Sequence, residues 1–256
     1  MSSIALQMTM PGLVNAGETG ATSVTVIIPA RDEERTLATI TERVVRTGLV
    51  RQIVIVDDGS RDATRSLARD LAGAYPGLIE VVVHDRPQGK GAAIGAALER
   101  VTGDLVIIQD ADLEYDPAEY AELLKPFGDA GVHAVYGSRN LRPNERSTWS
   151  YYWGGRMLSV VTNLLFGARI TDEATGYKLV RTAVLRELAL NARGFDFCAE
   201  LTGRLLRRGF VIREVPISYT PRSFEEGKKI RWRDGLVAVW VLVRERFARV
   251  SATKRA

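Results

Sequence analysis

The chain has very little cysteine and histidine. Cys198 is its one cysteine, and His84 and His133 are its two histidines. A single cysteine excludes an intramolecular disulfide and a multi-cysteine zinc site, and it fits a reducing compartment. Both histidines stand at the ends of apolar segments, so we expect structural roles for them and no histidine general base. No apolar run approaches the roughly 18 residues that a spanning helix needs, so we expect no segment that crosses a bilayer.

The chain also lacks a strong excess of either charge. Its 256 residues include 35 Lys and Arg against 31 Asp and Glu, which gives a formal charge of +4. That excess is too small, spread over the whole chain, to indicate a nucleic-acid partner. The 46% hydrophobic and 26% charged content excludes wholesale disorder.

Three parts are expected along the chain. Residues 1–23 are rich in Ser, Thr, Gly and Met without a hydrophobic period, and they are predicted to be a flexible leader with no secretory signal. Residues 24–229 are predicted to form one α/β domain, because a single core extends to about 250–300 residues. Residues 230–256 are predicted to form a basic amphipathic helix.

Five segments rich in Val and Ile predict a sheet. They are nearly continuous in apolar residues, which is typical of strands buried on both faces. They begin at Val24, Gln52, Leu78, Asp104 and His133. Stretches with one apolar helical face separate them, so the order indicates βαβ units and a mostly parallel, Rossmann-like sheet flanked by helices. Further helices are predicted over residues 151–166, 196–208 and 234–250, and a strand over residues 210–219.

Acidic residues follow three of these predicted strands. They include Glu33, Asp57, Asp58, Asp110, Asp112 and Glu114. Parallel strands end at one edge of a sheet, where ligands bind, so these carboxylates should gather there. Like charges that gather need a compensating cation, and oxygen ligands suit Mg²⁺ or Mn²⁺ with substrate phosphates. We therefore predict that Asp110 and Asp112 hold Mg²⁺ or Mn²⁺, with Glu114 as a further ligand. In the alternative interpretation, Asp112 caps a turn and Asp110 is solvated.

Two neighbouring motifs have alternative interpretations. Asp58 either contacts a nucleotide base or ribose, or belongs to a plain turn in which Ser60 caps the next helix, and both can hold. The glycines from Gly89 to Gly95 do not match the P-loop spacing. They follow the third strand, whereas the dinucleotide fingerprint follows the first. We interpret them as a turn that lets the following helix pack closely.

Seven ordered segments together resemble the motifs of family 2 glycosyltransferases of GT-A fold. They are VIIPARDEE, IVIVDDGSRDAT, GKGAAIGAAL, DLVIIQDADLEYDP, GSR, TDEATGYKL and a late arginine followed by GKK. Within that family the chain looks most like the dolichyl-phosphate mannose synthase branch with its bacterial polyprenyl-phosphate relatives. The resemblance extends from about Val24 to Lys229. It implies a GDP- or UDP-sugar donor, a divalent metal on the diphosphate, and inversion at the transferred sugar.

The resemblance also implies roles for individual residues. The expected donor contacts are Pro29, Arg31, Glu33, Asp58, Asp110, Ala111 (at the ribose), Arg139, Arg222, Lys228 and Lys229. The expected catalytic residues are Asp112, Arg139, Asp172 and Arg222. Arg139 and Arg222 fall where the family's arginines handle phosphates, and the two lysines fall near its final basic loop. That loop, RSFEEGKKI, is one residue longer here than the RxxGxSK form.

The acceptor determines whether a general base is needed. A lipid phosphate is already anionic near neutral pH, so it needs only positioning and cations. A hydroxyl acceptor would need a carboxylate, for which Asp172 is the candidate. The alternative role of Asp172 is to cap the turn before Thr175 and Gly176, and both interpretations stay open.

Tryptophan and arginine occur together in two late segments. Tyr152, Trp153 and Arg156 lie in the first, and Trp240 and Phe247 lie among arginines in the second. This combination is typical of interfacial helices, so we expect peripheral attachment to an anionic membrane surface on the cytoplasmic face. The alternative is ordinary core packing with a solvated basic tail.

The sequence therefore predicts an inverting, metal-dependent hexosyltransferase that moves one sugar from a nucleotide sugar to a polyprenyl phosphate. Two alternatives stay open: the same donor chemistry with a soluble hydroxyl acceptor, and a non-catalytic nucleotide-sugar-binding subunit. The intact acidic strand ends and Arg222 favour catalysis. No oligomeric state is predicted.

Overall fold

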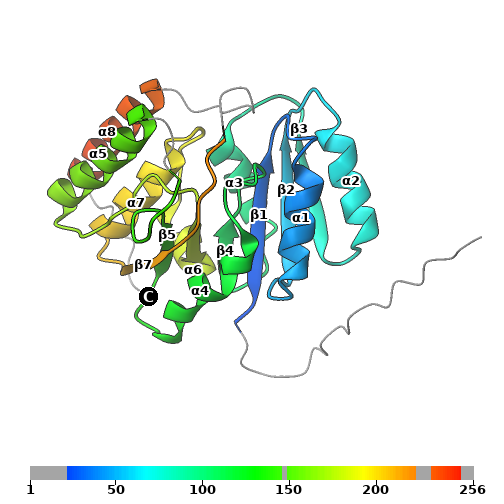
Figure 1. The fold of residues 1–256 in the computed structure, drawn as a ribbon, viewed down its shortest axis with the longest axis horizontal. Coiled ribbons are helices and arrows are strands. Elements are labelled where there is room, and N and C mark those ends of the chain that lie inside the picture. Colours follow the sequence, from blue (N-terminus) through cyan, green and yellow to red (C-terminus); the bar gives the residue numbers. More distant parts are fainter. Residues whose placement is uncertain (1–21, 146–148, 223–231, 249–256) are drawn as a thin grey trace, which may run out of the picture.

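The computed structural model describes residues 22–145, 149–222 and 232–248, and these form one α/β domain around a seven-stranded sheet (Figure 1). The strands are β1 (Val24–Ala30), β2 (Gln52–Asp58), β3 (Ile79–His84), β4 (Leu105–Ile108), β5 (Ala134–Ser138), β6 (Lys178–Arg181) and β7 (Ile212–Pro216). Their order in the sheet is β3-β2-β1-β4-β6-β5-β7. Only β6 runs antiparallel to its neighbours β4 and β5, so the predicted mostly parallel sheet is confirmed.

Helices cover both faces of the sheet. One face packs against α1 (Leu37–Arg46), α2 (Thr64–Ala74) and α4 (Tyr120–Leu124). The other packs against α3 (Lys90–Leu98), α6 (Thr182–Leu188) and α7 (Phe197–Arg207). The β1 side chains alternate between the two cores, with Val26 and Ile28 on the first face and Ile27 on the second. This two-sided burial explains why the strands are nearly continuous in Val and Ile.

Two later helices form an outer layer on α7. They are α5 (Trp149–Phe166) and α8 (Trp232–Phe247), which lie side by side at one end of the molecule (Figure 1). Ala238, Val241 and Leu242 of α8 are buried with Ala199 of α7, and α5 packs against this cluster. Within the described ranges no helix is long and apolar enough to cross a membrane. Residues 1–21 and the end of the chain lie outside the described residues, so the expected boundaries of leader and tail stay predictions.

The strand β6 is absent from the sequence expectation. It begins with Lys178, whose charge suggests a surface position, yet the side chain is fully buried. Its Nζ donates a hydrogen bond of 2.8 Å to the Glu173 carbonyl and lies 3.6 Å from the centre of the Tyr136 ring. These contacts compensate for the burial of the lysine charge. They involve residues outside the strand, so the four residues of β6 alone do not indicate that Lys178 is buried.

The glycines at the start of α3 are explained by close packing. Gly89 has a positive φ of 101°, and a side chain there or at Gly91 would collide with the carbonyl groups of Arg193 and Ala192. The Ala92 N–H also donates to the Arg193 carbonyl at 3.1 Å. The interpretation of this motif as a close-packing turn is therefore confirmed.

Candidate active site

Asp58, at the end of β2, holds the turn that precedes α3. Its Oδ1 lies 2.8 Å from His84 Nδ1 and accepts a 2.8 Å hydrogen bond from the Gln88 N–H. Its Oδ2 accepts one of 2.8 Å from the Gly89 N–H. Burial raises the pKa of Asp58, but these hydrogen bonds outweigh burial and hold it below its usual value. His84 therefore has the structural role expected of it, while the nucleotide contact of Asp58 stays a prediction.

The expected helix cap at Ser60 is wrong. The Ser60 hydroxyl accepts a 3.0 Å hydrogen bond from the Asp32 N–H, and it joins the loop after β1 to the loop after β2. Asp62 serves the start of α2 instead, because its Oδ1 accepts a 2.9 Å hydrogen bond from the Thr64 N–H. The Ser60 hydroxyl is engaged by the Asp32 N–H of the loop after β1 and does not cap α2. The local sequence around Ser60 does not indicate this contact.

Asp110 follows β4 and pairs with a lysine from α3. The Lys90 ammonium contacts Asp110 Oδ1, and both side chains are largely buried. Burial lowers the pKa of Lys90, but the Asp110 charge outweighs burial and raises it above its usual value. Gly176 passes so close to Asp110 that any side chain there would collide with the carboxylate. Lys90 lies in the GKGAAIGAAL motif, for which no role of the lysine was expected. Its position after the end of β3, at the same edge of the sheet as Asp110, is the sequence feature that could have indicated this contact.

Asp112 and Glu33 share one arginine. Arg222 donates from NH2 to Asp112 Oδ2 at 3.0 Å, and its guanidinium also contacts both Glu33 oxygens at 3.1 and 3.2 Å. Burial, followed by the charges of Asp110 and Glu114, raises the pKa of Asp112 to about 7. Asp112 is therefore repelled at close range by Asp110 and Glu114, as expected from the positions of these carboxylates after the strands.

Glu114 turns toward the segment that carries Arg222. Its Oε1 accepts a 2.9 Å hydrogen bond from the Arg222 N–H, and its Oε2 accepts one of 3.2 Å from the Tyr219 hydroxyl. Its carbonyl accepts one of 3.1 Å from the Thr220 N–H. Glu114 thus fixes the position of Arg222, and its role as a metal ligand stays a prediction.

The carboxylates of Asp110 and Asp112 suit a divalent cation that takes two protein ligands. Asp110 and Asp112 repel each other, and each is now balanced by a cationic side chain, Lys90 or Arg222. In the part of the chain that the structure describes, no three His, Cys, Asp or Glu side chains form a complete metal cage. A cation here would therefore take its remaining ligands from substrate phosphates or water, as Mg²⁺ commonly does.

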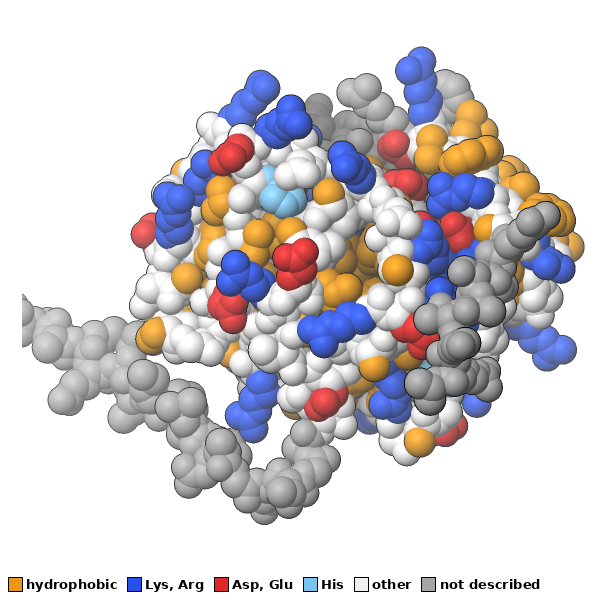
Figure 2. Space-filling model, turned by 180° about the vertical axis from the view of Figure 1, so that it is seen from behind, with side chains coloured by type: hydrophobic (Ala, Val, Ile, Leu, Met, Phe, Trp, Pro, Cys, Tyr) orange, Lys and Arg blue, Asp and Glu red, His pale blue; other side chains and the backbone are white. Residues whose placement is uncertain are grey.

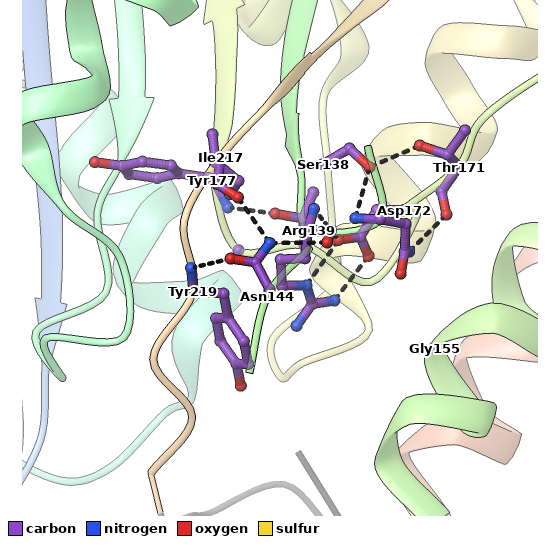
Figure 3. A network of polar contacts seen from close by, with 12 residues as sticks. Ser138, Arg139, Asn144, Gly155, Thr171, Asp172, Tyr177, Ile217 and Tyr219 are labelled. Atoms are coloured by element: carbon purple, nitrogen blue, oxygen red, sulfur yellow. Dashed lines mark hydrogen bonds and ion pairs between the residues drawn. The ribbon is translucent and has the colours of Figure 1, made fainter. Parts of the chain in front are cut away.

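Arg139 and Asp172 form a buried pair at the end of β5 (Figure 3). Asp172 is 1% exposed and accepts hydrogen bonds of 2.7 Å from both Nε and NH2 of Arg139, and one of 3.0 Å from the Arg139 N–H. Burial lowers the pKa of Arg139, but nearby Tyr115 and Asp172 raise it well above its usual value. The guanidinium also lies 5.0 Å from the centre of the Tyr219 ring. Asp172 therefore orients Arg139.

The alternative role of Asp172, as a cap of the turn before Thr175 and Gly176, gains no support. Among the described residues, the hydrogen bonds to the Asp172 carboxylate all come from Arg139. That alternative stays a prediction. The role of Asp172 as a general base for a hydroxyl acceptor stays a prediction, although both oxygens are engaged by Arg139.

Beside this pair lies a cavity of about 360 Å³. Its wall includes Arg139, Arg142 and Arg156, and it also includes Tyr152 and Gly155 of α5 and Tyr219. Figure 3 shows Gly155 on α5, on the other side of this region from Arg139 and Asp172. Asn144 braces this wall, because its amide donates to the Arg139 and Ile217 carbonyls at 2.9 Å each. No role was expected for Asn144, because it lies in a polar stretch without a motif.

The remaining expected donor residues have different surroundings. Pro29 is half-buried at the end of β1, and Arg31 is exposed with its Nε 3.6 Å from an Asp32 oxygen. The Ala111 side chain is buried in the core, so a ribose contact there would come from its main chain. Lys228 and Lys229 lie outside the described residues.

An apolar and basic surface lies on α5 and α8, and we call it the α5–α8 face. Large hydrophobic side chains gather there, at the upper right of Figure 2. They are Trp153, Met157, Val160 and Leu164 of α5, and Leu236, Val237, Trp240, Val243 and Phe247 of α8. Leu164 is 81% exposed and Phe247 is 74% exposed. Arg244 and Arg246 lie among them, with Arg244 5.1 Å from the centre of the Trp240 ring.

Comparisons with known proteins place the chain in a family. Residues 25–189 match the model of glycosyl transferase family 2. Polyprenol monophosphomannose synthase from Mycolicibacterium smegmatis is 34% identical over 254 residues, which cover 91% of this chain and 95% of that protein. Dolichol-phosphate mannosyltransferase from Pyrococcus furiosus is 27% identical and covers 80% of this chain, which spans 58% of its length. The chain therefore belongs to glycosyl transferase family 2, and it is a glycosyltransferase.

Solved structures support the fold. Glucosyl-3-phosphoglycerate synthase from Mycobacterium tuberculosis, in complex with UDP, has a TM-score of 0.69 at 19% identity, covering 90% of this chain and 82% of that one. The same protein with Mn²⁺, UDP and glucosyl-3-phosphoglycerate has a TM-score of 0.66 at 21% identity, covering 88% and 80%. The GT-A-like fold expected from the sequence is confirmed.

Proposed function

We propose that this glycosyltransferase moves one sugar from a GDP- or UDP-sugar to a polyprenyl phosphate, with inversion and with Mg²⁺ or Mn²⁺. The M. smegmatis relative, whose name states a polyprenol monophosphomannose product, covers nearly the whole of both chains. An undecaprenyl-phosphate 4-deoxy-4-formamido-L-arabinose transferase from Edwardsiella ictaluri is 26% identical over 80% of this chain, which spans 62% of its length. The names of both relatives refer to a polyprenyl phosphate, as the product in the first and as the substrate in the second.

One observation carries the donor half of the proposal. Asp110 and Asp112 are two repelling carboxylates at the strand ends, each balanced by a cationic side chain. A divalent cation on these two carboxylates would neutralise the charge of a leaving nucleoside diphosphate. Lys90 and Arg222 already lie at this edge, where they are placed to contact the diphosphate oxygens. Arg222 suits this role because its planar fork binds two oxygens at once.

The acceptor half of the proposal rests on Arg139. Its side chain lines the cavity, and Asp172 and Tyr219 hold it in one orientation. An acceptor phosphate bound there brings an anionic nucleophile, so the chain needs to position it and to reduce its repulsion from the donor. The carboxylate of Asp172 is fully used by Arg139, which favours a phosphate acceptor over a hydroxyl that would need a base.

The α5–α8 face completes the proposal with a site of membrane contact. Its exposed tryptophan, leucine and phenylalanine side chains suit the headgroup boundary, and its arginines suit anionic lipid. The cavity is lined by Tyr152, Gly155 and Arg156 of the same helix α5. The proposal puts the acceptor phosphate at Arg139, its apolar chain toward the face, and the enzyme on the cytoplasmic side of the membrane.

A donor screen tests the proposed function. The protein is incubated with each nucleotide sugar, Mg²⁺ or Mn²⁺, and a polyprenyl phosphate, and the products are identified by mass. We expect one monoglycosylated polyprenyl phosphate, formed only with a divalent cation. Transfer to a soluble hydroxyl acceptor alone would favour the first alternative. Binding of a nucleotide sugar without turnover on any acceptor would favour the non-catalytic alternative.

A further inference from the structure

Nothing in the part of the chain that the structure describes requires a glycine at position 155 of α5. Gly155 is not among the glycines with positive φ, so its backbone suits any residue. Among the described residues, a Cβ at position 155 would meet only the Ala174 Cβ, at an ordinary distance of 3.8 Å. At Gly203 of α7, by contrast, a Cβ would lie 2.9 Å from Glu245, so packing requires that glycine. Glycine is unfavourable in a helix interior compared with alanine, so the space at position 155 needs another explanation.

The open space at Gly155 faces the cavity. Tyr152, Gly155 and Arg156 share one side of α5, since residues three and four apart lie on one helix face. Across the cavity stand Arg139 and Asp172 (Figure 3). A side chain at position 155 would therefore extend toward the group that occupies the space in front of Arg139.

The apolar surface of α5 lies on the other side of the helix. Trp153 and Met157 are 55% and 63% exposed, and they belong to the α5–α8 face. Each is two positions from Gly155, so neither shares its side of α5. A phosphate held by Arg139 would therefore have Gly155 beside it, and the part of the acceptor next to the phosphate would meet this glycine first.

We propose that Gly155 is the specificity-determining position for the acceptor, because its missing side chain admits the first, methyl-branched isoprene unit beside the phosphate. This inference rests on the proposed polyprenyl phosphate acceptor. It adds that the size of residue 155 limits the bulk tolerated next to the phosphate. A side chain here would exclude a branched prenyl phosphate more strongly than a linear alkyl phosphate of similar length.

Gly154 provides a matched control. It is the preceding residue of α5, it is exposed, and a Cβ there would meet no described residue within 4 Å. It does not line the cavity. Gly155→Ala, Gly155→Val, Gly154→Ala and Gly154→Val therefore change helix propensity in the same way at both positions, but only the first pair narrows the cavity.

The test measures transfer kinetics with farnesyl phosphate and with linear dodecyl phosphate, together with calorimetric binding of the nucleoside diphosphate in Mn²⁺. For Gly155→Val we expect the KM for farnesyl phosphate to rise roughly tenfold or more, as for an overfilled site. Gly155→Ala should show a smaller rise in the same direction. The rise with dodecyl phosphate should be smaller in both, nucleotide affinity should be unchanged, and the Gly154 variants should match the wild type.

Three results would overturn the inference. One is a Gly155→Val variant with wild-type KM for farnesyl phosphate. Another is a loss of nucleotide binding equal to the loss of acceptor use in the folded Gly155→Ala variant, which would indicate a structural effect. A third is wild-type protein that glycosylates no prenyl phosphate, and in that case the proposed function fails as well. If the wild type transfers sugar to farnesyl phosphate and the Gly155 variants have the same KM, the inference about Gly155 fails while the proposed function stands.

Discussion

Protonation of Asp112 should change the stability of the metal-free protein. Its pKa rises on folding from the usual 3.8 to about 7, because of burial and then because of the charges of Asp110 and Glu114. Between these two values the folded state binds a proton that the unfolded chain has released. Ionisation of Asp112 therefore lowers the stability of the folded protein as pH rises through this window, and the full loss is present above it.

Asp112→Asn should consequently stabilise the metal-free protein at high pH. We expect a gain of about 1–4 kcal/mol near pH 8 that shrinks toward pH 4, since each pKa unit corresponds to about 1.4 kcal/mol. Thermal unfolding in a chelator measures it.

Asp62→Asn is the control of opposite sign. Burial raises the pKa of Asp62, but its hydrogen bonds outweigh burial and hold it below its usual value. Loss of that carboxylate should lower stability at neutral pH. An Asp112→Asn effect that is independent of pH would contradict this picture of the acidic group.

At the residue scale, the sequence predicted which residues lie in the site better than it predicted which residues contact each other. Glu33, Asp110 and Asp112 were expected at the edge of the sheet, and the resemblance implied that Arg222 contacts phosphates; the structure brings all four together. The pairing of Asp172 with Arg139 was not expected. The two residues are 33 positions apart, so their contact depends on how β5 and the loop before β6 meet in the sheet.

At the scale of elements, a buried ion network attaches α8 to α7. Glu245 of α8 is 2% exposed, and its carboxylate lies 3.4 Å from both Arg204 and Arg207 of α7. It also contacts Arg244 at 3.0 Å. Removal of one partner from such a network leaves buried charges without compensation.

Glu245→Ala should therefore destabilise the protein by about 3–5 kcal/mol in denaturant unfolding. Glu187→Ala is the matched control, because Glu187 pairs with Arg208 at 3.1 Å but its side chain is 53% exposed. That variant should change the free energy of unfolding by less than about 1 kcal/mol. Equal effects of the two substitutions would show that the α7–α8 network does not anchor α8.

Long, strongly patterned elements were predictable from the sequence, and short ones were not. Strands β1 and β2 begin at the predicted residues, Val24 and Gln52, because both faces of these strands are buried and their centres are apolar. Strand β6 has only four residues and starts with a buried lysine, and α6 follows it directly. Both elements are too short to show a hydrophobic period, so neither could be predicted from the sequence alone.

At the scale of the whole molecule, the α5–α8 face should hold the enzyme on anionic membranes. Leu164→Asp and Trp240→Asp each place a charge on that face, at side chains that are 81% and 60% exposed. We expect each to weaken binding to vesicles that contain phosphatidylglycerol by roughly tenfold, because the lost apolar burial and the added negative charge both oppose binding. Cosedimentation with vesicles measures this.

Leu49→Asp is the control for that measurement. Leu49 is 40% exposed and lies between α1 and β2, away from the α5–α8 face. This variant should bind vesicles as the wild type does, and nucleotide binding should be unchanged in all three variants. Vesicle binding that all three substitutions weaken equally would speak against a defined membrane-binding face.

The central claim is that Asp110 and Asp112 form a nucleoside diphosphate site that works with a divalent cation. Calorimetric titration of the wild type and of Asp112→Asn with GDP and UDP, in Mn²⁺ and in a chelator, tests it most directly. We predict that one nucleotide binds the wild type at least tenfold more tightly with Mn²⁺, about 1.4 kcal/mol or more, and that Asp112→Asn removes the difference. Equal wild-type affinity with and without the cation, or a cation dependence that persists in Asp112→Asn, would contradict it.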